Sequence, residues 1–280
     1  FTGLIINQIY FWSMNQTIIQ RALGAKSLVE AQKGLLYTGV LKIFVPIIII
    51  LPGVIGFYYF NDSFYENQDM IYPELLKIVL PAGVVGIFAA IVMGAVLSTF
   101  NSVLNSASTI FSIDIYKNFY NNNVSDKKLV TIGKITSAIL AVFAMLVAPL
   151  VADAPEGLYQ LLQQLNGIFF IPIASIMIAG FFIKKISPEG AKISLFVGLT
   201  FYIVSTFILK IDLHFVHIWG IEFIINIFVM LLASLYYPNI KIFKIDDLNL
   251  IELKEWKHTK VMSLLLVILT ITIYIVLSQN

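Results

Sequence analysis

The chain has 280 residues, of which 59% are hydrophobic and 12% are charged, and its formal net charge is +2. Soluble domains carry roughly 25% charged residues, and several apolar runs here exceed the roughly 20 residues that cross a bilayer. These proportions predict an all-α polytopic membrane protein, and the small net charge gives no indication of nucleic-acid binding. The absence of cysteine excludes disulfides, thiolate metal sites and cysteine nucleophiles.

The apolar runs predict about eight membrane-spanning helices. Their approximate ranges are 1–19, 35–60, 83–117, 128–152, 157–182, 188–209, 217–237 and 261–279. The sequence opens inside an apolar run, with neither an initiating methionine nor a leader pattern. We therefore expect it to be the C-terminal part of a longer protein.

Basic residues gather in alternate connections between these spans. Of the 18 lysines and arginines, Lys77 and Lys210 lie in one set of connections, Lys42 lies within a span, and the others lie in the opposite set. Cytoplasmic loops are the ones enriched in basic residues. The pattern predicts a multi-pass protein of the plasma (inner) membrane, with both ends of the chain on the extracellular or periplasmic side.

The first span combines amide and aromatic side chains. In chain order they are Asn7, Gln8, Tyr10, Phe11, Trp12, Asn15 and Gln16. Amides can hydrogen-bond the hydroxyls of a polar, ring-shaped ligand, while a flat aromatic ring covers its apolar face. Amide bonds between helices, together with an interfacial aromatic belt, explain the same pattern equally well.

The connection after the first span carries Ser27 followed by Glu30, a capping signature that predicts a short surface helix. Lys42 then lies about two turns inside the second span. A lysine at that depth either extends to the cytoplasmic surface or meets a polar cavity.

The stretch 83–117 is the one around which the sequence is organised. It begins as an apolar helix and then becomes polar without becoming charged. Spacings of three and four residues place one set of its polar side chains on a single helix face: Ser98, Ser102, Asn105, Thr109 and Ser112. Such a face must meet other helices or a water-filled path. Hydroxyl oxygens suit a small hard cation such as sodium, and close helix packing is the alternative.

The fifth span has a polar first half, followed by Gly167 and Pro172. The polar residues are Gln160, Gln163, Gln164 and Asn166. This order predicts a helix that bends or gates over a cavity, and a polar interfacial helix start is the alternative. We expect the sixth and seventh spans to be plain apolar helices.

Four stretches together resemble the sodium–solute symporter family and, within it, the sodium–sugar symporter branch. They are NQTIIQRALGAKSLVEAQKG, LKIFVP around Lys42, LSTFNSVLNSASTIFSIDIY and GFFIKKISPEGAKISLFVG. The resemblance implies the second half of a fold of two inverted five-helix repeats, the one shared with the amino-acid transporter LeuT. Residues 1–280 would then be a single, incomplete membrane transport domain that lacks the first repeat.

The resemblance also implies site residues. For sodium, the family's backbone carbonyl and two adjacent hydroxyls match Ala95, Ser98 and Thr99. For the solute, the matching residues are Gln8, Phe11, Trp12, Lys42 and Gln163. The sugar branch has asparagine and tyrosine where Gln8 and Phe11 stand, so the register of Asn7 with Gln8, and of Tyr10 with Phe11, stays open.

The function that the resemblance implies is sodium-coupled import of a sugar or similar polyhydroxylated solute. Sodium would be the coupling ion, the partners would be the solute and the lipid bilayer, and no organic cofactor or nucleic acid would be involved. The alternatives are another solute of the same family (inositol, sialic acid, a vitamin or another organic solute) or a transporter-like membrane sensor. We expect no enzymatic activity, because the spans offer no paired aspartates, His-Glu metal motif or Ser-His pair.

Overall fold

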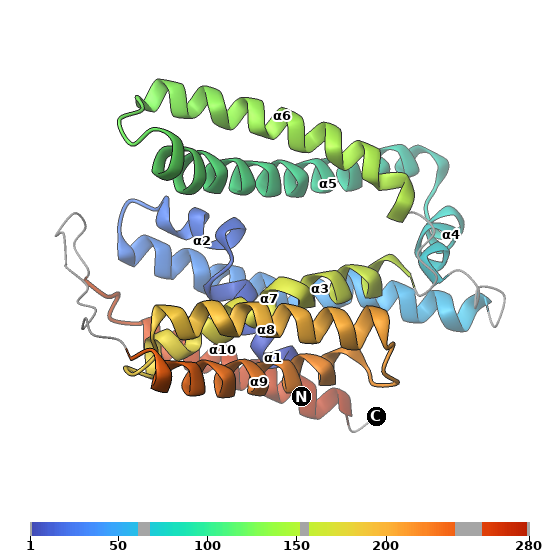
Figure 1. Ribbon diagram of the computed structural model, residues 1–280. Coiled ribbons are helices and arrows are strands. Elements are labelled where there is room, and N and C mark those ends of the chain that lie inside the picture. Colours follow the sequence, from blue (N-terminus) through green and yellow to red (C-terminus); the bar gives the residue numbers. More distant parts are fainter. Residues whose placement is uncertain (1, 61–67, 152–156, 239–253, 279–280) are drawn as a thin grey trace. The chain divides into compact units, whose positions relative to one another are not determined.

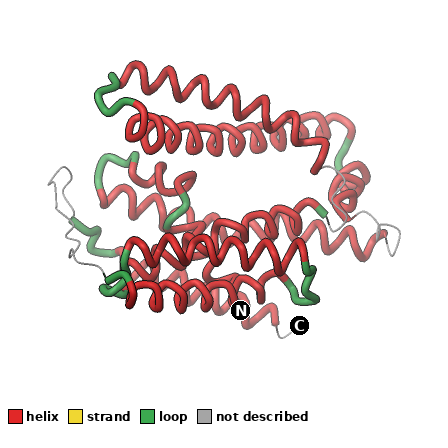
Figure 2. The backbone as a smooth tube through the Cα atoms, in the orientation of Figure 1, coloured by secondary structure: helices red, strands yellow, loops and turns green. Residues whose placement is uncertain are grey.

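The computed structural model describes residues 2–60, 68–151, 157–238 and 254–278. Within these ranges the chain forms helices joined by loops, and no β-strand occurs among them (Figure 2). This confirms the predicted all-α fold. Two of the basic residues that indicate orientation, Lys241 and Lys244, lie outside the described residues.

Among the described residues, seven helices are long and apolar enough to cross a membrane (Figure 1). They are α3 (Leu28–Phe60), α5 (Ala82–Ile110) with its π-helical continuation η3 (Phe111–Tyr120), α6 (Asp126–Val151), α7 (Leu158–Phe182), α8 (Pro188–Ile203) with the π-helical η4 (Val204–Ile208), α9 (Phe215–Tyr236) and α10 (Thr259–Ser278). The shorter described helices are α1 (Gly3–Ser13), α2 (Gln16–Leu23), η2 (Gln68–Met70) and α4 (Ile71–Val79). The polytopic membrane fold is thereby confirmed.

The first predicted span, 1–19, is not a single helix. Helix α1 ends at Ser13 and α2 begins at Gln16. At the break, the Asn15 side-chain oxygen accepts a hydrogen bond from the Thr17 amide at 2.9 Å. Asparagine competes with the helix for backbone hydrogen bonds, which explains why the chain turns here.

The predicted cap before the second span is confirmed, because Ser27 Oγ accepts a hydrogen bond from the Glu30 amide at 3.3 Å. The predicted separate surface helix is wrong, since α3 continues from this cap to Phe60 without a break. The weakest helix former before the apolar run is Gly34, and one glycine costs a helix only about 1 kcal/mol.

The chain divides into two compact units, which we treat separately. Unit 1 comprises residues 1–19 and 154–248, and unit 2 comprises residues 20–153 and 249–280. In unit 1, α1, α7, α8 and α9 pack against one another. In unit 2, α5 and η3 pack against α6, and α3 packs against α4 and α10.

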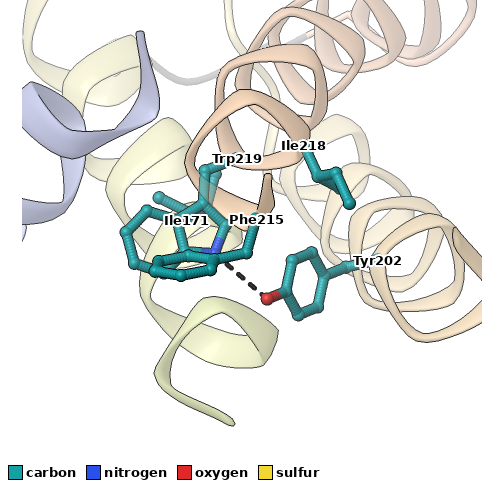
Figure 3. Packing of buried hydrophobic residues seen from close by; sticks show 5 residues of the cluster. All are labelled: Ile171, Tyr202, Phe215, Ile218 and Trp219. Carbon is teal, nitrogen blue, oxygen red and sulfur yellow. Dashed lines mark hydrogen bonds between the residues drawn. The ribbon is translucent and has the colours of Figure 1, made fainter. Parts of the chain in front are cut away.

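The core of unit 1 is the place where α7, α8 and α9 meet, and Figure 3 shows its cluster: Ile171, Tyr202, Phe215, Ile218 and Trp219. The Trp219 indole donates a hydrogen bond to the Tyr202 hydroxyl at 3.2 Å (Figure 3). That hydroxyl donates in turn to the Gln164 carbonyl oxygen at 2.9 Å. Gly167 lies against both rings, and a Cβ there would lie 2.5 Å from the Tyr202 hydroxyl oxygen. The missing side chain at 167 is what allows the three helices to approach.

The interface between α8 and α9 is polar, which corrects the expectation of plain apolar helices. We call this interface the polar seam. Its members recur every four residues on each helix: Gly190, Ser194, Gly198 and Tyr202 on α8, and Glu222, Asn226, Met230 and Ser234 on α9, all of them buried. Ser194 Oγ donates to the Asn226 carbonyl oxygen at 2.9 Å. Small residues allow membrane helices to approach closely and to hydrogen-bond across their interface.

Candidate functional site

The three candidate sodium ligands lie on one turn of α5, in unit 2. Thr99 Oγ1 donates a hydrogen bond to the Ala95 carbonyl oxygen at 3.0 Å, so two of the candidate oxygens are adjacent. Ala95, Ser98 and Thr99 are all exposed. A hydroxyl oxygen that donates its proton retains lone pairs. The hydrogen bond within the helix therefore leaves Thr99 able to coordinate a cation.

A cavity of about 730 Å³ lies beside this turn, also within unit 2. It is lined by Gln20, Arg21, Gly94, Leu97, Ser98, Asn101, Ser102 and Asn105. The Arg21 guanidinium donates a hydrogen bond to Ser102 Oγ, and Ser102 Oγ donates to the Ser98 carbonyl oxygen at 2.8 Å. We call the helix face with Ser98, Ser102, Asn105, Thr109 and Ser112 the hydroxyl face. Its N-terminal part thus borders a polar cavity. Arg21 is a member that the sequence did not predict, and its charge opposes a cation bound nearby.

The C-terminal end of the same hydroxyl face, near Ser112, has a different environment. Ser112 is buried, and its hydroxyl donates to the Ser108 carbonyl oxygen at 2.7 Å. On α6, a Cβ added to Gly133 would lie 3.4 Å from Ser112 Oγ. At this end the alternative interpretation, close packing of helices, is the one that the structure supports.

Three of the candidate solute residues lie on α1, in unit 1. The Trp12 indole donates to Gln8 Oε1 at 3.1 Å, and the Phe11 and Trp12 rings meet edge to face with centroids 5.3 Å apart. Gln8 is exposed, and the two rings are half-buried. One turn of α1 therefore presents an amide beside two aromatic rings, which is the combination that the sequence predicted.

The candidate on α7, Gln163, belongs to the same unit. Its Oε1 accepts a hydrogen bond from Asn166 Nδ2 at 3.5 Å, and α7 packs against α1. The Phe11 ring lies 6.5 Å from the Phe170 ring on α7. Lys42 differs from the other solute candidates, because it lies exposed on α3, which belongs to unit 2.

The two alternative assignments on α1, Asn7 with Tyr10 or Gln8 with Phe11, correspond to two different faces of the helix. Asn7 and Tyr10 are buried, and the Tyr10 ring packs against Phe170 with centroids 4.6 Å apart. Gln8 and Phe11 lie on the more exposed face. Asn7 Oδ1 has no hydrogen-bond partner among the described residues. A buried, unpaired amide oxygen makes Asn7 a further candidate for solute contact.

Glu222 on α9 is a candidate that the sequence analysis missed. It is 0% exposed, and neither carboxyl oxygen has a hydrogen-bond partner among the described residues. An ionisable residue inside a membrane span is a candidate for function. The available signal was a single acidic residue in the mostly apolar run 215–236. In the described ranges, His, Asp and Glu side chains form no group that could hold a metal ion.

Comparison with known proteins gives a consistent result. The family model described as "Sodium:solute symporter family" matches residues 2–198. The chain is 41% identical over its whole length to the uncharacterized symporter YidK of Escherichia coli, covering 48% of that protein. It is 33% identical to a sodium/glucose cotransporter of Vibrio parahaemolyticus, over 73% of the chain and 40% of the relative.

A third relative is the sodium/myo-inositol cotransporter 2 of Oryctolagus cuniculus, which is 30% identical over 70% of the chain and 32% of its own length. The chain thus spans less than half the length of these curated relatives.

Proposed function

Because the chain belongs to the sodium:solute symporter family, we propose that the full-length protein is a sodium-coupled symporter that imports a sugar or a similar polyhydroxylated solute. The observation that carries the solute class is the turn of α1 on which the Gln8 amide lies beside the Phe11 and Trp12 rings. Amides hydrogen-bond solute hydroxyls, and aromatic rings cover the apolar face of a sugar ring. Relatives with sodium/glucose and sodium/myo-inositol in their names support the same class.

We place the coupling ion on α5, at the Ala95 carbonyl oxygen and the Ser98 and Thr99 hydroxyls. These are neutral oxygen ligands on one exposed helical turn beside a polar cavity. Sodium and solute would favour the same conformation of the transporter, so each would raise the affinity for the other. In this proposal Gln163 on α7, which belongs to the same unit as α1, contributes a further contact to the solute.

The experiment is uptake of radiolabelled solute by the full-length protein in proteoliposomes. We expect an inward sodium gradient to drive uptake of glucose or galactose, and potassium to be unable to replace sodium. The variant Ser98→Ala/Thr99→Ala should raise the sodium concentration at half-maximal uptake by about tenfold or more, which is a loss of about 1.4 kcal/mol.

The matched control is Thr109→Ala, because Thr109 also donates to the carbonyl oxygen one turn earlier, that of Asn105, at 2.7 Å. This variant loses the same kind of hydrogen bond and should retain wild-type sodium dependence. Uptake that ignores sodium in the wild type would contradict the proposal. Equal losses in the two variants would move sodium away from Ser98 and Thr99.

The second candidate function is symport of another family solute, with myo-inositol first because of the inositol relative. Sodium-driven uptake of myo-inositol that excess glucose does not inhibit would favour it. Sodium dependence and the effect of Ser98→Ala/Thr99→Ala should be the same for either solute, since the ion and solute residues are different.

A further inference from the structure

Among its described residues, unit 1 contains a buried carboxyl group that the proposed symport does not use. Glu222 is fully buried in α9, and both of its oxygens lack a hydrogen-bond partner among the described residues. An unpaired carboxylate in a medium of low dielectric constant is far more costly than the neutral acid. Glu222 therefore carries a proton in the packed arrangement of α8 and α9.

The groups that face Glu222 come from the elements packed against α9, which are α1, α7, α8 and η4. Tyr202 on α8 is the titratable group that is buried in the polar seam with Glu222, and its hydroxyl contacts α9 through Trp219. The other titratable side chains of these elements and of α9 lie elsewhere. Five are exposed, namely Tyr159, Glu189, Lys192, His217 and Tyr236, and Tyr10 packs against Phe170. None of them supplies a buried positive charge to pair with Glu222.

A second unpaired polar group lies one turn from Glu222 on the same face of α9. Asn226 is 0% exposed, and its Nδ2 has no hydrogen-bond partner among the described residues. Ser194 occupies the other side of this amide, with Oγ 3.3 Å from Asn226 Oδ1. Residues four apart are neighbours on a helix. The free amide donor is therefore one turn from the carboxyl oxygens, and an internal water molecule could bridge the two.

A cavity in unit 1 begins one turn from Glu222 along α9. The cavity has a volume of about 630 Å³, and its lining includes Thr206, Lys210, Asp212 and Ile218. Thr206 lies one turn beyond Tyr202, and its buried Oγ1 has no hydrogen-bond partner in the described ranges. Ile218 lies one turn before Glu222 on α9. Hydroxyls both donate and accept hydrogen bonds, so the Thr206 hydroxyl can bind a water molecule of this cavity.

We propose that Glu222 is a proton-binding site beside the free amide donor of Asn226, and that it exchanges its proton with water of this cavity past Thr206. On binding, an O–H bond of a hydronium ion in the cavity breaks and an O–H bond forms at a carboxylate oxygen of Glu222, which leaves a neutral water molecule. On release, that bond breaks, the proton returns to cavity water, and the Asn226 amide stabilises the carboxylate. Neither Glu222 nor Asn226 is among the residues proposed for sodium or solute, and the site does not depend on which solute is transported.

Infrared spectroscopy of the full-length protein tests the proposal directly. A protonated carboxylic acid has a C=O stretching band that is distinct from the carboxylate bands. We expect such a band at neutral pH, a shift of the band in D₂O, and its reversible loss as the pH is raised. The nearly isosteric Glu222→Gln should abolish the band, whereas the exposed control Glu189→Gln should retain it. Glu222→Asp keeps an acid and should move the band, which gives a second test if the amide variant folds poorly.

Two results would overturn the proton site. The absence of a Glu222-dependent acid band at neutral pH would mean that the group is ionised and paired. A band that neither shifts in D₂O nor changes with pH while the protein stays folded would mean a static buried acid. The route has its own test, since Thr206→Val should slow the deuterium shift severalfold relative to wild type, and an unchanged rate would refute the route through Thr206.

Discussion

The same substitution at two glycines of α7 should have opposite effects on stability. Gly167 faces the core of unit 1, where an added Cβ would collide with Trp219 Nε1 and lie 2.6 Å from Tyr202 Cζ. Gly180 is exposed, and an added Cβ would meet nothing within 4 Å among the described residues. Gly167→Ala should therefore destabilise the protein, and Gly180→Ala should leave its stability unchanged or raise it.

The magnitudes follow from the contacts. Overpacking a core costs about 1–3 kcal/mol, and a weakened hydrogen bond between Trp219 and Tyr202 adds about 1 kcal/mol. Replacing glycine by alanine in a helix stabilises the folded protein by about 1 kcal/mol at either position. Gly167→Ala should thus lose about 1–3 kcal/mol and Gly180→Ala should gain about 0–1 kcal/mol. At 1.4 kcal/mol per tenfold, roughly tenfold or more should separate their unfolding equilibria.

The assay is thermal unfolding of the full-length protein in detergent, followed by the amount of monodisperse protein that survives heating. Wild type, Gly167→Ala and Gly180→Ala are compared at one detergent concentration. Equal shifts for the two variants would refute the reasoning, because they would show that α7, α8 and α9 do not meet at Gly167. Solute uptake by Gly167→Ala should also fall, since the position is one turn from Gln163.

Two further predictions concern single amide side chains. Gln32→Ala should remove the acceptor that binds the Trp256 amide at 2.8 Å and the Thr259 hydroxyl at 2.9 Å. Hydrogen exchange of the Trp256 amide should then accelerate about tenfold. The control Gln32→Glu retains an acceptor oxygen and should keep the Trp256 amide protected. Gln163→Ala should raise the solute concentration at half-maximal uptake about tenfold, the cost of about one hydrogen bond, without changing the sodium dependence. An unchanged value for Gln163→Ala would remove that residue from the solute site, and equal exchange in both Gln32 variants would show that the side-chain oxygen does not hold α10 to α3.

The helices were predictable where one apolar run forms one helix. The predicted span 83–117 corresponds to α5 with η3, which together cover Ala82–Tyr120. A membrane helix satisfies its backbone hydrogen bonds internally, so length and hydropathy are sufficient to identify it. The break between α1 and α2 was harder to predict, because it depends on whether the Asn15 side chain caps the next helix or bonds another helix. The sequence allows both outcomes.

The site could be predicted only in part. Periodicity placed Ser98 and Ser102 on one face of a helix, and the structure confirms that both border a cavity. The contact of Arg21 with Ser102 could not be predicted, because 81 residues separate the two positions along the chain. No local pattern indicates which helix of unit 2 lies beside the hydroxyl face.

Glu222 was missed for a different reason. Averaged hydropathy hides one acidic residue in a 22-residue helix, and its importance becomes visible only when α9 is paired with α8. The spacing of four that puts Glu222 and Asn226 on one face was present in the sequence, as was the matching series of Ser194, Gly198 and Tyr202. Two such series on consecutive apolar spans indicate a polar interface between them, which is a pattern that single-helix analysis does not test.

The hydroxyl groups of α5 show why periodicity alone cannot separate cation coordination from helix packing. Thr99 and Ser112 each donate to a carbonyl oxygen one turn earlier, at 3.0 and 2.7 Å. Their donor protons are therefore used in the same way, and only the oxygen lone pairs can differ in function. Ser112 is buried close to Gly133 of α6, whereas Thr99 is exposed. An incoming cation can reach only those lone pairs that no neighbouring helix covers. This is the physical reason for proposing sodium at the Ala95–Thr99 turn rather than at the end of the hydroxyl face near Ser112.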